Sequence, residues 1–241
     1  MKFVTYNIQA AIGTKAYRHY FTEVGHQVFN TRKKTATLKK IAEFISNYDV
    51  ACIQEIDLGG RRSGYKCQGD HLLELSDFNY IALQENRRVG NISKHGNAIL
   101  SKFPLYDVHD LKLPGKRKGR GAIMASVDGP DKFHVVNGHF SLGLADQLDQ
   151  ARFLARAARP KRPLIIAGDF NSGSASTPVN LLADELDLRV LTKPNVKTYP
   201  SWNPWRDYDH ILASPQISVD RIGSIDIRHS DHLPVEAEFK L

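Results

Sequence analysis

The sequence contains few cysteines, and the two that are present match no cysteine-based site. Cys52 lies in the apolar stretch VACIQEI and Cys67 in the polar stretch GYKCQGD. Their spacing is not that of a cysteine zinc site, and two cysteines in 241 residues are too few for a disulfide scaffold. We therefore expect a reducing compartment, the cytoplasm.

Long apolar runs, internal repeats, low-complexity tracts and linkers are also missing from the sequence. No window approaches the roughly 18 apolar residues of a membrane span. The N-terminal stretch MKFVTYNIQ is too short and too polar for a signal peptide. The sequence predicts a single domain, residues 1–241, with no transmembrane segment, and we expect a monomer.

Acidic residues are outnumbered by basic ones. The chain has 33 Lys and Arg against 26 Asp and Glu, a net charge of +7, and a pI of about 9.3. This surplus favours anionic partners, namely nucleic acid, phosphorylated small molecules or an acidic membrane surface. A basic surface without such a partner explains the charge equally well, because net charge governs solubility and steering rather than a site.

Apolar patterning predicts strands interspersed with a few helices. The predicted strands are residues 2–8, 50–56, 96–105, 163–171, 207–214 and 233–241, with a hairpin of GAIMASVD and KFHVVNGHF around Gly129-Pro130-Asp131. One predicted helix spans 31–48, with Thr31 or Asn30 as its cap, Leu38, Ile41, Ala42 and Ile45 at helical spacing, and Lys33, Lys34, Lys39 and Lys40 facing water. The other spans 144–158, with Leu144, Leu148, Ala151 and Leu154 on one side. This order favours one α/β domain with mixed sheets.

Polar residues stand at the C-terminal ends of several predicted strands: Asn7, Glu55, His139, Asp169 and Asn171. Strand ends that converge in a crevice are where α/β proteins place their sites. Each residue also has a structural explanation. A strand-end carboxylate such as Glu55 is often a cap or an ion-pair partner, and the GDFN stretch fits a turn with local Asx bonds.

Taken together, these residues match the requirements of metal-assisted phosphoester hydrolysis. A hard cation such as Mg²⁺ prefers oxygen ligands and draws charge from a phosphoryl oxygen. A histidine oriented by a carboxylate can activate water. Amide and imidazolium groups can stabilise the charge that develops on the phosphoryl group.

Six short motifs carry a resemblance to a known group of enzymes. TYNIQ, IQEID, NGH, GDFN, YDHIL and SDHLPV occur in this order between residues 5 and 235. With them the chain resembles the endonuclease/exonuclease/phosphatase superfamily, which includes DNase I, AP endonucleases, tyrosyl-DNA phosphodiesterases, neutral sphingomyelinases and inositol polyphosphate 5-phosphatases. The resemblance implies a DNase I-like α/β fold, a four-layer α-β-β-α sandwich of two mixed, mainly antiparallel sheets flanked by helices. It also implies phosphoester hydrolysis with Mg²⁺, for which Mn²⁺ can substitute.

The resemblance implies roles for eight residues at matching positions. They are metal binding for Asn7, Glu55 and Asp231, phosphate contact for His139, placement of the water and the transition state for Asp169 and Asn171, orientation of the last histidine for Asp209, and general-base action for His232. Whether Asp169 or His232 takes the proton of the water stays open. Gln9 departs from the N-x-D pattern of many nuclease-like members and adds no charge. We therefore expect Glu55 to hold the metal and no second tightly bound ion.

Candidate specificity residues lie in the loops, and each has an alternative role on the surface or in the core. Arg61 and Arg62 follow Glu55 closely and can hold a second phosphate. His95 and Asn97 are candidates for the rim of the site. Trp202, with Trp205, can stack on a base or pin its loop to the core. The basic run KLPGKRKGR, residues 112–120, can follow a nucleic-acid backbone or remain a solvated loop.

The leading hypothesis is a Mg²⁺-dependent phosphodiesterase or nuclease acting on DNA or DNA ends, with water as nucleophile. A phospholipid or sphingomyelin phosphodiesterase is the nearest alternative, but it would need an exposed apolar loop that the sequence does not reveal. Another phosphatase of the same superfamily is a further alternative. A non-catalytic nucleic-acid-binding module is the alternative of a different class.

Overall fold

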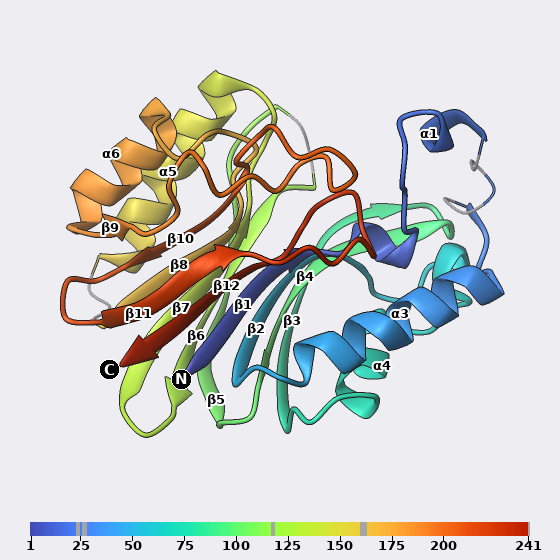
Figure 1. Cartoon of the computed structure of the whole chain (residues 1–241), viewed down its shortest axis with the longest axis horizontal. Coiled ribbons are helices and arrows are strands. Elements are labelled where there is room, and N and C mark those ends of the chain that lie inside the picture. Colours follow the sequence, from blue (N-terminus) through green and yellow to red (C-terminus); the bar gives the residue numbers. More distant parts are fainter. Residues whose placement is uncertain (23–24, 26–27, 117–118, 160–162, 241) are drawn as a thin grey trace.

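The structure is a computed structural model that describes residues 1–22, 25, 28–116, 119–159 and 163–240. Its centre is a pair of six-stranded sheets (Figure 1). The first sheet has the order β11-β12-β1-β2-β4-β3 and consists of β11 (Ser218–Ser224), β12 (Val235–Lys240), β1 (Lys2–Asn7), β2 (Val50–Asp57), β4 (Ser93–Ser101) and β3 (Tyr80–Val89). The second has the order β5-β6-β7-β8-β10-β9 and consists of β5 (Leu105–Lys112), β6 (Gly121–Asp128), β7 (Lys132–His139), β8 (Leu164–Asp169), β10 (Asp209–Ala213) and β9 (Arg189–Val190).

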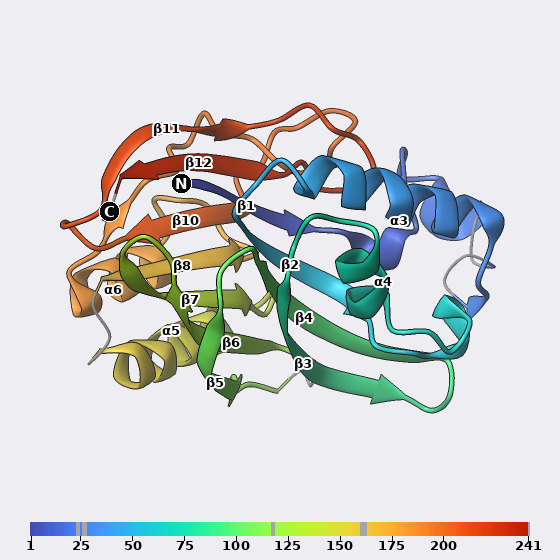
Figure 2. The same ribbon diagram turned by 90° about the horizontal axis from the view of Figure 1, so that it is seen from below.

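Helices cover the outer face of each sheet and complete four layers (Figure 2). Helices α3 (Arg32–Ile45) and α4 (Gln68–Glu74) pack on the first sheet, and α5 (Leu144–Ala158) and α6 (Thr177–Leu186) pack on the second. A third apolar cluster, which includes Phe3, Ile99, Ile123 and Ile165, fills the space between the sheets. Only β1–β2 and β7–β8 are parallel among the paired strands of the described chain, so both sheets are mixed and mainly antiparallel. The predicted DNase I-like sandwich is confirmed.

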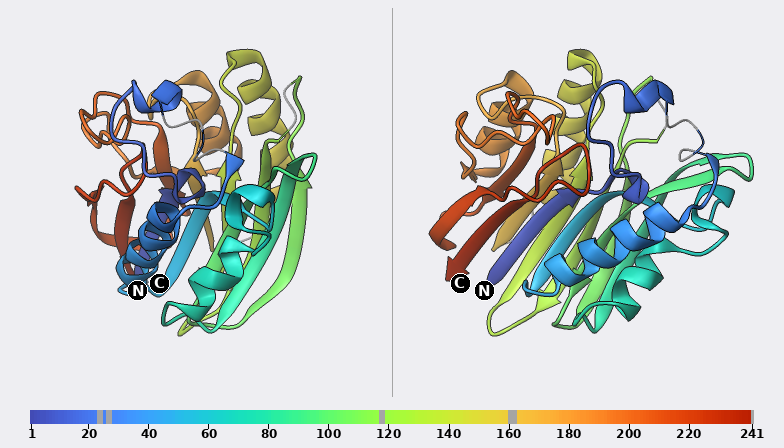
Figure 3. Two further views of the ribbon diagram at one scale, coloured as in Figure 1. Left: turned by 90° about the vertical axis from the view of Figure 1, so that its right-hand side faces the viewer. Right: turned by 45° about the vertical axis from the view of Figure 1, so that its right-hand side comes forward.

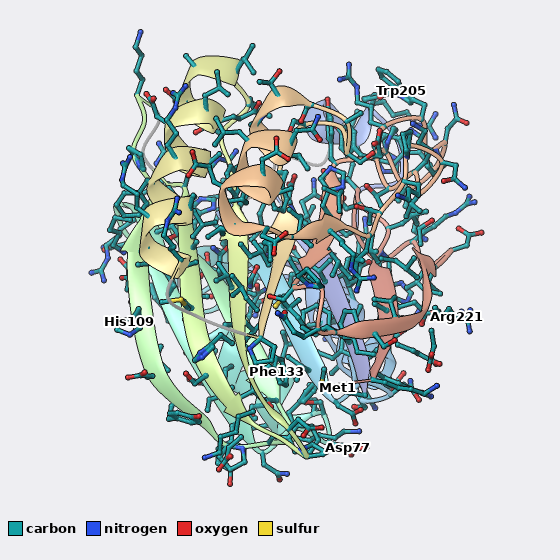
Figure 4. All side chains as sticks on the ribbon, turned by 90° about the vertical axis from the view of Figure 1, so that its left-hand side faces the viewer. Met1, Asp77, His109, Phe133, Trp205 and Arg221 are labelled. Carbon is teal, nitrogen blue, oxygen red and sulfur yellow. The ribbon has the colours of Figure 1, made fainter. Side chains whose placement is uncertain are left out.

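The strands that run parallel bring their C-terminal ends to one end of the sandwich. Trp205 lies at this end, away from Met1 and Asp77 at the other (Figure 4). Helix α1 (His19–Thr22) and the long loop before β10 also lie at this end (Figure 3). The aromatic rings of Tyr17 and Trp202 join the two segments, with centroids 5.1 Å apart. No helix in the described ranges is long and apolar enough to cross a membrane.

All the strands predicted from the sequence form, with changed ends. The strand predicted at 96–105 begins earlier, at Ser93, and ends at Ser101 because Pro104 closes a turn before β5. Strands β3, β5, β9 and β11 and helices α1, α4 and α6 were not predicted. The four missed strands are the four edges of the two sheets, where the apolar pattern is weakest.

Two helix faces differ from the prediction. Thr31 caps α3 as expected, but Lys34 is buried, not solvent-facing, because its Nζ donates to the backbone carbonyl of Arg62. In α5 the predicted side is only half right, since Leu144 is 58% exposed. Gln147 and Gln150 take the inner position at that end, where their amides bond to Ser141.

Candidate active site

Glu55 is directed to the site by an irregularity in β2. The register of the β2–β4 pairing shifts between Ile53 and Ile56, and Glu55 there has a φ of +56°. Such a bulge turns a strand-end side chain away from the alternation of the ladder. The buried amide of Asn137 in the second sheet donates to the carbonyl of Ile53, at 2.9 Å, and accepts from Gln54, at 2.6 Å. This contact between the sheets fixes the bulge and therefore the position of Glu55.

The carboxylate of Glu55 accepts no hydrogen bond from the described residues. The Nε2 atom of His139 lies 3.7 Å from one of its oxygens, and the side chain of Glu55 is 33% exposed. An unpaired carboxylate at the edge of the core is costly unless a cation or a donor joins it.

Asn7 ends β1 and is almost fully buried. Its Nδ2 donates to Oδ2 of Asp169 at 3.0 Å, and its Oδ1 accepts from the backbone of Gln9 at 3.1 Å. Gln9, the residue that departs from the N-x-D pattern, donates its side-chain amide to Oδ2 of Asp231 at 3.0 Å. Gln9 thus positions the carboxylate of Asp231 and does not take the place of the acid that the N-x-D pattern has at this position.

His139 and Asp169 are register partners on the parallel strands β7 and β8. This close approach requires Gly168, because a Cβ there would lie 1.9 Å from the carbonyl oxygen of Gly138. The Nε2 atom of His139 lies 3.5 Å from Oδ2 of Asp169, and Arg120 contacts the same imidazole. Burial, with the charge of Arg120, holds the pKa of His139 well below its usual value, so the ring is neutral.

His232 and Asp209 form the tightest charged pair of the site. The Nδ1 atom of His232 lies 2.8 Å from Oδ2 of Asp209, and both residues are buried. Burial by itself would lower the pKa of His232, but the carboxylates of Asp209 and Asp169 outweigh it and hold this pKa well above the usual value. Burial raises the pKa of Asp169 to about 7, although His232 opposes this. Asp169, Asp209 and His232 offer ligand atoms that all lie within 4.8 Å of one another.

Asn171 completes this group from the turn after β8. It adopts a φ of +50°, and its backbone N–H donates to Oδ1 of Asp169 at 2.9 Å. Its side-chain amide donates to the carbonyl of Phe140 at 3.0 Å. The two oxygens of Asp169 are therefore held from two sides, by Asn7 and by Asn171.

Two adjoining pockets open onto these residues and share Glu55, Arg120 and His139. One, of about 410 Å³, we call the aromatic pocket, and it is lined by Tyr17, Leu142, Tyr199, Trp205, Arg206 and Tyr208 together with Asp169, Asn171, Asp231 and His232. The other, of about 610 Å³, we call the basic pocket, and Arg87, His95, Lys116 and Arg120 are among its lining residues.

The aromatic pocket is built by ring contacts within the loop before β10. Tyr199 stacks on Tyr208, with centroids 5.7 Å apart, and lies 4.9 Å from the ring of His232. The guanidinium of Arg206 lies over the ring of Trp205 at 4.0 Å. These contacts leave Trp205 more than half exposed beside the buried acids.

The structure thus brings together the eight residues to which the sequence analysis gave metal or catalytic roles. Six of them line the aromatic pocket, and the other two, Asn7 and Asp209, bond to the lining residues Asp169 and His232.

Two of the predicted specificity residues, Arg62 and Asn97, are buried. Arg62 is buried and its guanidinium binds the carboxylate of Asp57, so it is not available to a substrate phosphate. Asn97 is fully buried and donates to Gln84 and to the carbonyl of Gly121, so it does not form the rim. Both predictions are wrong because these polar side chains satisfy neighbouring buried groups.

Two further candidate specificity residues, Trp202 and Arg61, make contacts other than the predicted ones. Trp202 packs edge-on against Tyr17, and among the described residues it is Trp205 that lines the aromatic pocket. Arg61 is exposed and its guanidinium lies 4.8 Å from the ring centre of Phe29. His95, by contrast, does line a pocket beside Glu55. In the basic run 112–120, Arg117 and Lys118 lie outside the described residues.

Arg87, Arg206 and Tyr17 line the two pockets but were not predicted from the sequence. Arg87 belongs to the edge strand β3, which the apolar pattern did not reveal. Arg206 and Tyr17 stand in irregular segments with no motif signal. Only the folded chain shows that they meet the motif residues.

A comparison with protein-family models decides the relationship. The model described as "Endonuclease/Exonuclease/phosphatase family" matches residues 4–232. The chain belongs to this family. Members of the endonuclease/exonuclease/phosphatase family are hydrolases of phosphoesters and generally depend on divalent metals.

Solved structures of the same family share the fold at low sequence identity. The chain is similar to an endonuclease/exonuclease/phosphatase from Beutenbergia cavernae, with 21% identity and a TM-score of 0.78 over 100% of this chain and 71% of that one. It is also similar to a mannosyl-6-phosphatase from Bacteroides thetaiotaomicron, with 17% identity and a TM-score of 0.73 over 100% of both chains. The catalytic domain of human Nocturnin matches with 18% identity and a TM-score of 0.74, over 100% of this chain and 94% of that one. No curated protein matches the sequence significantly.

The residues at the site suit the divalent cation on which the family generally depends. The carboxylate of Glu55 has no hydrogen-bond donor among the described residues. Asn7 adds an oxygen atom from the end of β1, and Asp231 adds oxygen atoms from the loop before β12. An all-oxygen set with one or two carboxylates is the chemistry that Mg²⁺ and Mn²⁺ prefer.

Proposed function

We propose that this protein is a metal-dependent phosphodiesterase that hydrolyses nucleic acid, DNA or DNA ends, with water as the nucleophile. The observation that carries the proposal is the buried His232–Asp209 pair, which lies against Asp169 in the pocket that also contains Glu55. A single cleft then holds a cation site, a water site and donors for a phosphoryl group.

Glu55, Asp231 and Asn7 would hold the cation, which we propose to be Mg²⁺, with Mn²⁺ as a substitute. When bound, the cation polarises a phosphoryl oxygen and offsets its negative charge. Gln9 holds Asp231 in place through its side-chain amide, at 3.0 Å. Because only one carboxylate of the set lacks a hydrogen-bond donor, we propose a single tightly bound ion.

Asp169 and His232 have different roles: Asp169 accepts a proton, and His232 stabilises developing negative charge. Asp169 is held by Asn7 on one oxygen and by the backbone of Asn171 on the other, a geometry suited to accepting the proton of the attacking water. Asp209 fixes Nδ1 of His232 and keeps the ring protonated, so Nε2–H can donate to a phosphoryl oxygen as charge develops. Neutral His139, between Glu55 and Asp169, would contact the same phosphate.

The aromatic pocket supports a nucleic-acid substrate. Bases stack on aromatic side chains with about 1–3 kcal/mol per base, without requiring a particular sequence. Trp205, which is more than half exposed, offers such a face in the pocket that His232 also lines, and Arg206 adds a cation over the same ring. The net charge of +7 adds a general attraction for a polyanion.

A lipid phosphodiester is the second candidate, because the structure reveals exposed apolar residues that the sequence did not. Leu142, Leu144 and Trp205 are each more than half exposed, and Leu142 and Trp205 line the aromatic pocket. Apolar side chains at the mouth of a phosphoesterase site can enter the acyl region of a membrane.

A substrate panel with a metal control tests the proposal. Bis-p-nitrophenyl phosphate, single-stranded and duplex DNA, abasic DNA, 5′-tyrosyl DNA, RNA, sphingomyelin vesicles and inositol phosphates are each assayed with Mg²⁺, with Mn²⁺ and with EDTA. The proposal expects EDTA-sensitive cleavage of DNA or of a DNA end in excess of the lipid. Faster cleavage of sphingomyelin would select the second candidate. Metal-dependent turnover of none of these esters would leave a binding module and contradict the proposal.

A further inference from the structure

The basic pocket lies beside the proposed reaction centre but is not used by the chemistry described above. It shares Glu55, Arg120 and His139 with the aromatic pocket and extends away from them with a volume of about 610 Å³. Among the residues that the structure describes, Arg87, Lys116 and Arg120 contribute cationic side chains to its wall, and Glu55 contributes a carboxylate. If Glu55 holds a cation, the pocket has an uncompensated positive charge.

The cations of this pocket differ from the other exposed cations nearby. Arg88, the neighbour of Arg87 in β3, is paired with Glu85 at 3.0 Å, and Lys112 is paired with Asp110 at 2.8 Å. Within the described ranges, neither Arg87 nor Lys116 forms an ion pair. Clustered like charges repel, so a group of unpaired cations in one concave site favours an anionic ligand.

The backbone holds these cations in place from two elements that are far apart in sequence. The backbone N–H of Lys116 donates to both carboxylate oxygens of Asp146 in α5, at 3.2 and 3.1 Å. Gly119 packs closely against the side chain of Arg87. A Cβ added at Gly119 would lie only 3.0 Å from the Cβ and the Cδ of Arg87. Arg87 of the edge strand β3 and the described residues Lys116, Gly119 and Arg120 therefore line the pocket together.

His95 adds a neutral hydrogen-bond donor of known tautomer. The buried guanidinium of Arg62, held by Asp57, lies with Nη2 at 3.3 Å from Nδ1 of His95. A guanidinium can only donate, so Nδ1 of His95 accepts and a neutral ring carries its proton on Nε2. Arg62, a candidate phosphate ligand in the sequence, contacts His95 instead.

We propose that the basic pocket binds a second phosphate of the substrate, covalently joined to the group that carries the scissile phosphoester. The inference rests on the proposed function and narrows it to substrates with two phosphates, such as a nucleotide phosphorylated on both the 3′ and the 5′ position. Arg87 and Lys116 hold the second phosphate, and Arg120, at the boundary of the two pockets, lies between the two anions. The aromatic pocket holds the base or the remaining ester group on the opposite side of Glu55 and His139.

A binding experiment tests the pocket without requiring turnover. Calorimetry compares thymidine 3′,5′-bisphosphate with thymidine 5′-monophosphate and thymidine 3′-monophosphate, with Mg²⁺ and with EDTA. The bisphosphate is expected to bind at least about tenfold more tightly than either monophosphate, since a charge-assisted contact has that magnitude. Arg87→Gln and Lys116→Gln should each remove most of this difference. Arg88→Gln is the matched control, one residue away in the same strand and paired outside the pocket, and it should keep the difference.

Hydrolysis of paired chromogenic esters connects the pocket to the reaction. The p-nitrophenyl ester of thymidine 5′-phosphate is compared with its 3′-phosphorylated counterpart, and the thymidine 3′-ester with its 5′-phosphorylated counterpart. In at least one pair the added phosphate should raise kcat/KM about tenfold in the wild-type protein and in the control Arg88→Gln, and Arg87→Gln should abolish this gain. Equal binding of mono- and bisphosphates, or an unchanged preference in Arg87→Gln, would overturn the inference. Retention of the bisphosphate preference without hydrolysis of any ester would instead reject the proposed function and keep the pocket.

Discussion

The imidazole of His232 and the carboxylate of Asp209 are joined at 2.8 Å, although the two residues are 23 positions apart in the chain. Asp209 begins β10, and His232 stands in the loop before β12, so the pair joins the second sheet to the C-terminal part of the first. Both groups are buried, and Asp169 lies 3.8 Å from the free nitrogen of the ring. The chemistry that we propose depends on this arrangement.

Replacement of His232 should affect the reaction far more than the fold. His232→Ala removes the donor to the phosphoryl oxygen, and we expect kcat for bis-p-nitrophenyl phosphate to fall by at least about 100-fold. Asp209→Asn should lower kcat as well, because it removes the charge that keeps His232 protonated. His109→Ala, an exposed histidine on β5, serves as the control. Activity within a fewfold of wild type in a folded His232→Ala protein would remove His232 from the mechanism.

Loss of the Glu55 carboxylate should weaken metal binding. Glu55→Gln keeps the shape of the side chain but removes its charge, so the Mg²⁺ concentration for half-maximal activity should rise at least about tenfold. Isothermal titration with Mn²⁺ reports the same change without turnover. The comparison variant is Glu85→Gln, which removes a half-buried carboxylate that is already paired with Arg88. An unchanged Mn²⁺ affinity in Glu55→Gln would show that this carboxylate is not a ligand.

Truncation of Trp205 tests the stacking surface. Trp205→Ala should raise KM for a single-stranded oligonucleotide about fivefold or more, in line with the energy of one stacked base, and should leave kcat for bis-p-nitrophenyl phosphate nearly constant. Tyr106→Ala removes an exposed ring from the edge strand β5 and controls for the general loss of an aromatic surface. A KM that does not move would assign Trp205 to packing with Arg206 alone. If instead binding to sphingomyelin vesicles is lost, the lipid candidate gains support.

The buried pair of Asp57 and Arg62 should control stability and its pH dependence. Burial opposes ionisation of Asp57, but Arg62 and the hydrogen bonds from Gly60 and Ser63 outweigh it and lower the pKa of this carboxyl. A depressed carboxyl pKa contributes stability that is complete above the pKa of the unfolded chain and is lost as the pH falls through the folded value. Asp57→Asn leaves Arg62 buried without its counter-charge and should cost about 3 kcal/mol at neutral pH.

Denaturant unfolding from pH 7 to pH 3 provides the measurement for this pair. The wild-type protein should lose stability steeply in acid, and the gap to Asp57→Asn should narrow as the carboxyl of Asp57 is protonated. Asp77→Asn, at an exposed position, should behave as the wild type does. A difference between Asp57→Asn and wild type that is constant across this pH range would contradict the assignment.

The sequence predicted the central strands and the motif residues because their signals are local. The central strands β1, β2, β7, β8 and β10 are almost completely buried, so their apolar runs are strong, and a polar residue at their end is conspicuous. Nearly every residue of the edge strand β5 is exposed, so its sequence LYDVHDLK shows no clear alternation of apolar and polar residues. Arg87 was overlooked for this reason, as it belongs to another edge strand.

Other features depended on contacts that no local pattern encodes. A lysine at the position of Lys34 in the helix pattern is expected to face solvent. Its Nζ donates instead to the backbone carbonyl of Arg62, which belongs to a different element. Arg62 resembles a phosphate ligand in its glycine-rich loop, but Asp57 takes its guanidinium. The bulge at Glu55 depends on Asn137, which lies in the other sheet. Each of these is a long-range pairing of polar groups, and only the folded chain reveals it.

Crystals soaked in Mn²⁺ offer the most direct test of the metal site, since the anomalous signal of Mn²⁺ locates the ion independently of activity. The account predicts one strong anomalous peak within coordinating distance, about 2.2 Å, of an oxygen of Glu55, on the side of Asp231 and His232. A peak at a different place on the protein, or no peak in crystals of a protein that hydrolyses phosphodiesters in the presence of EDTA, would contradict it.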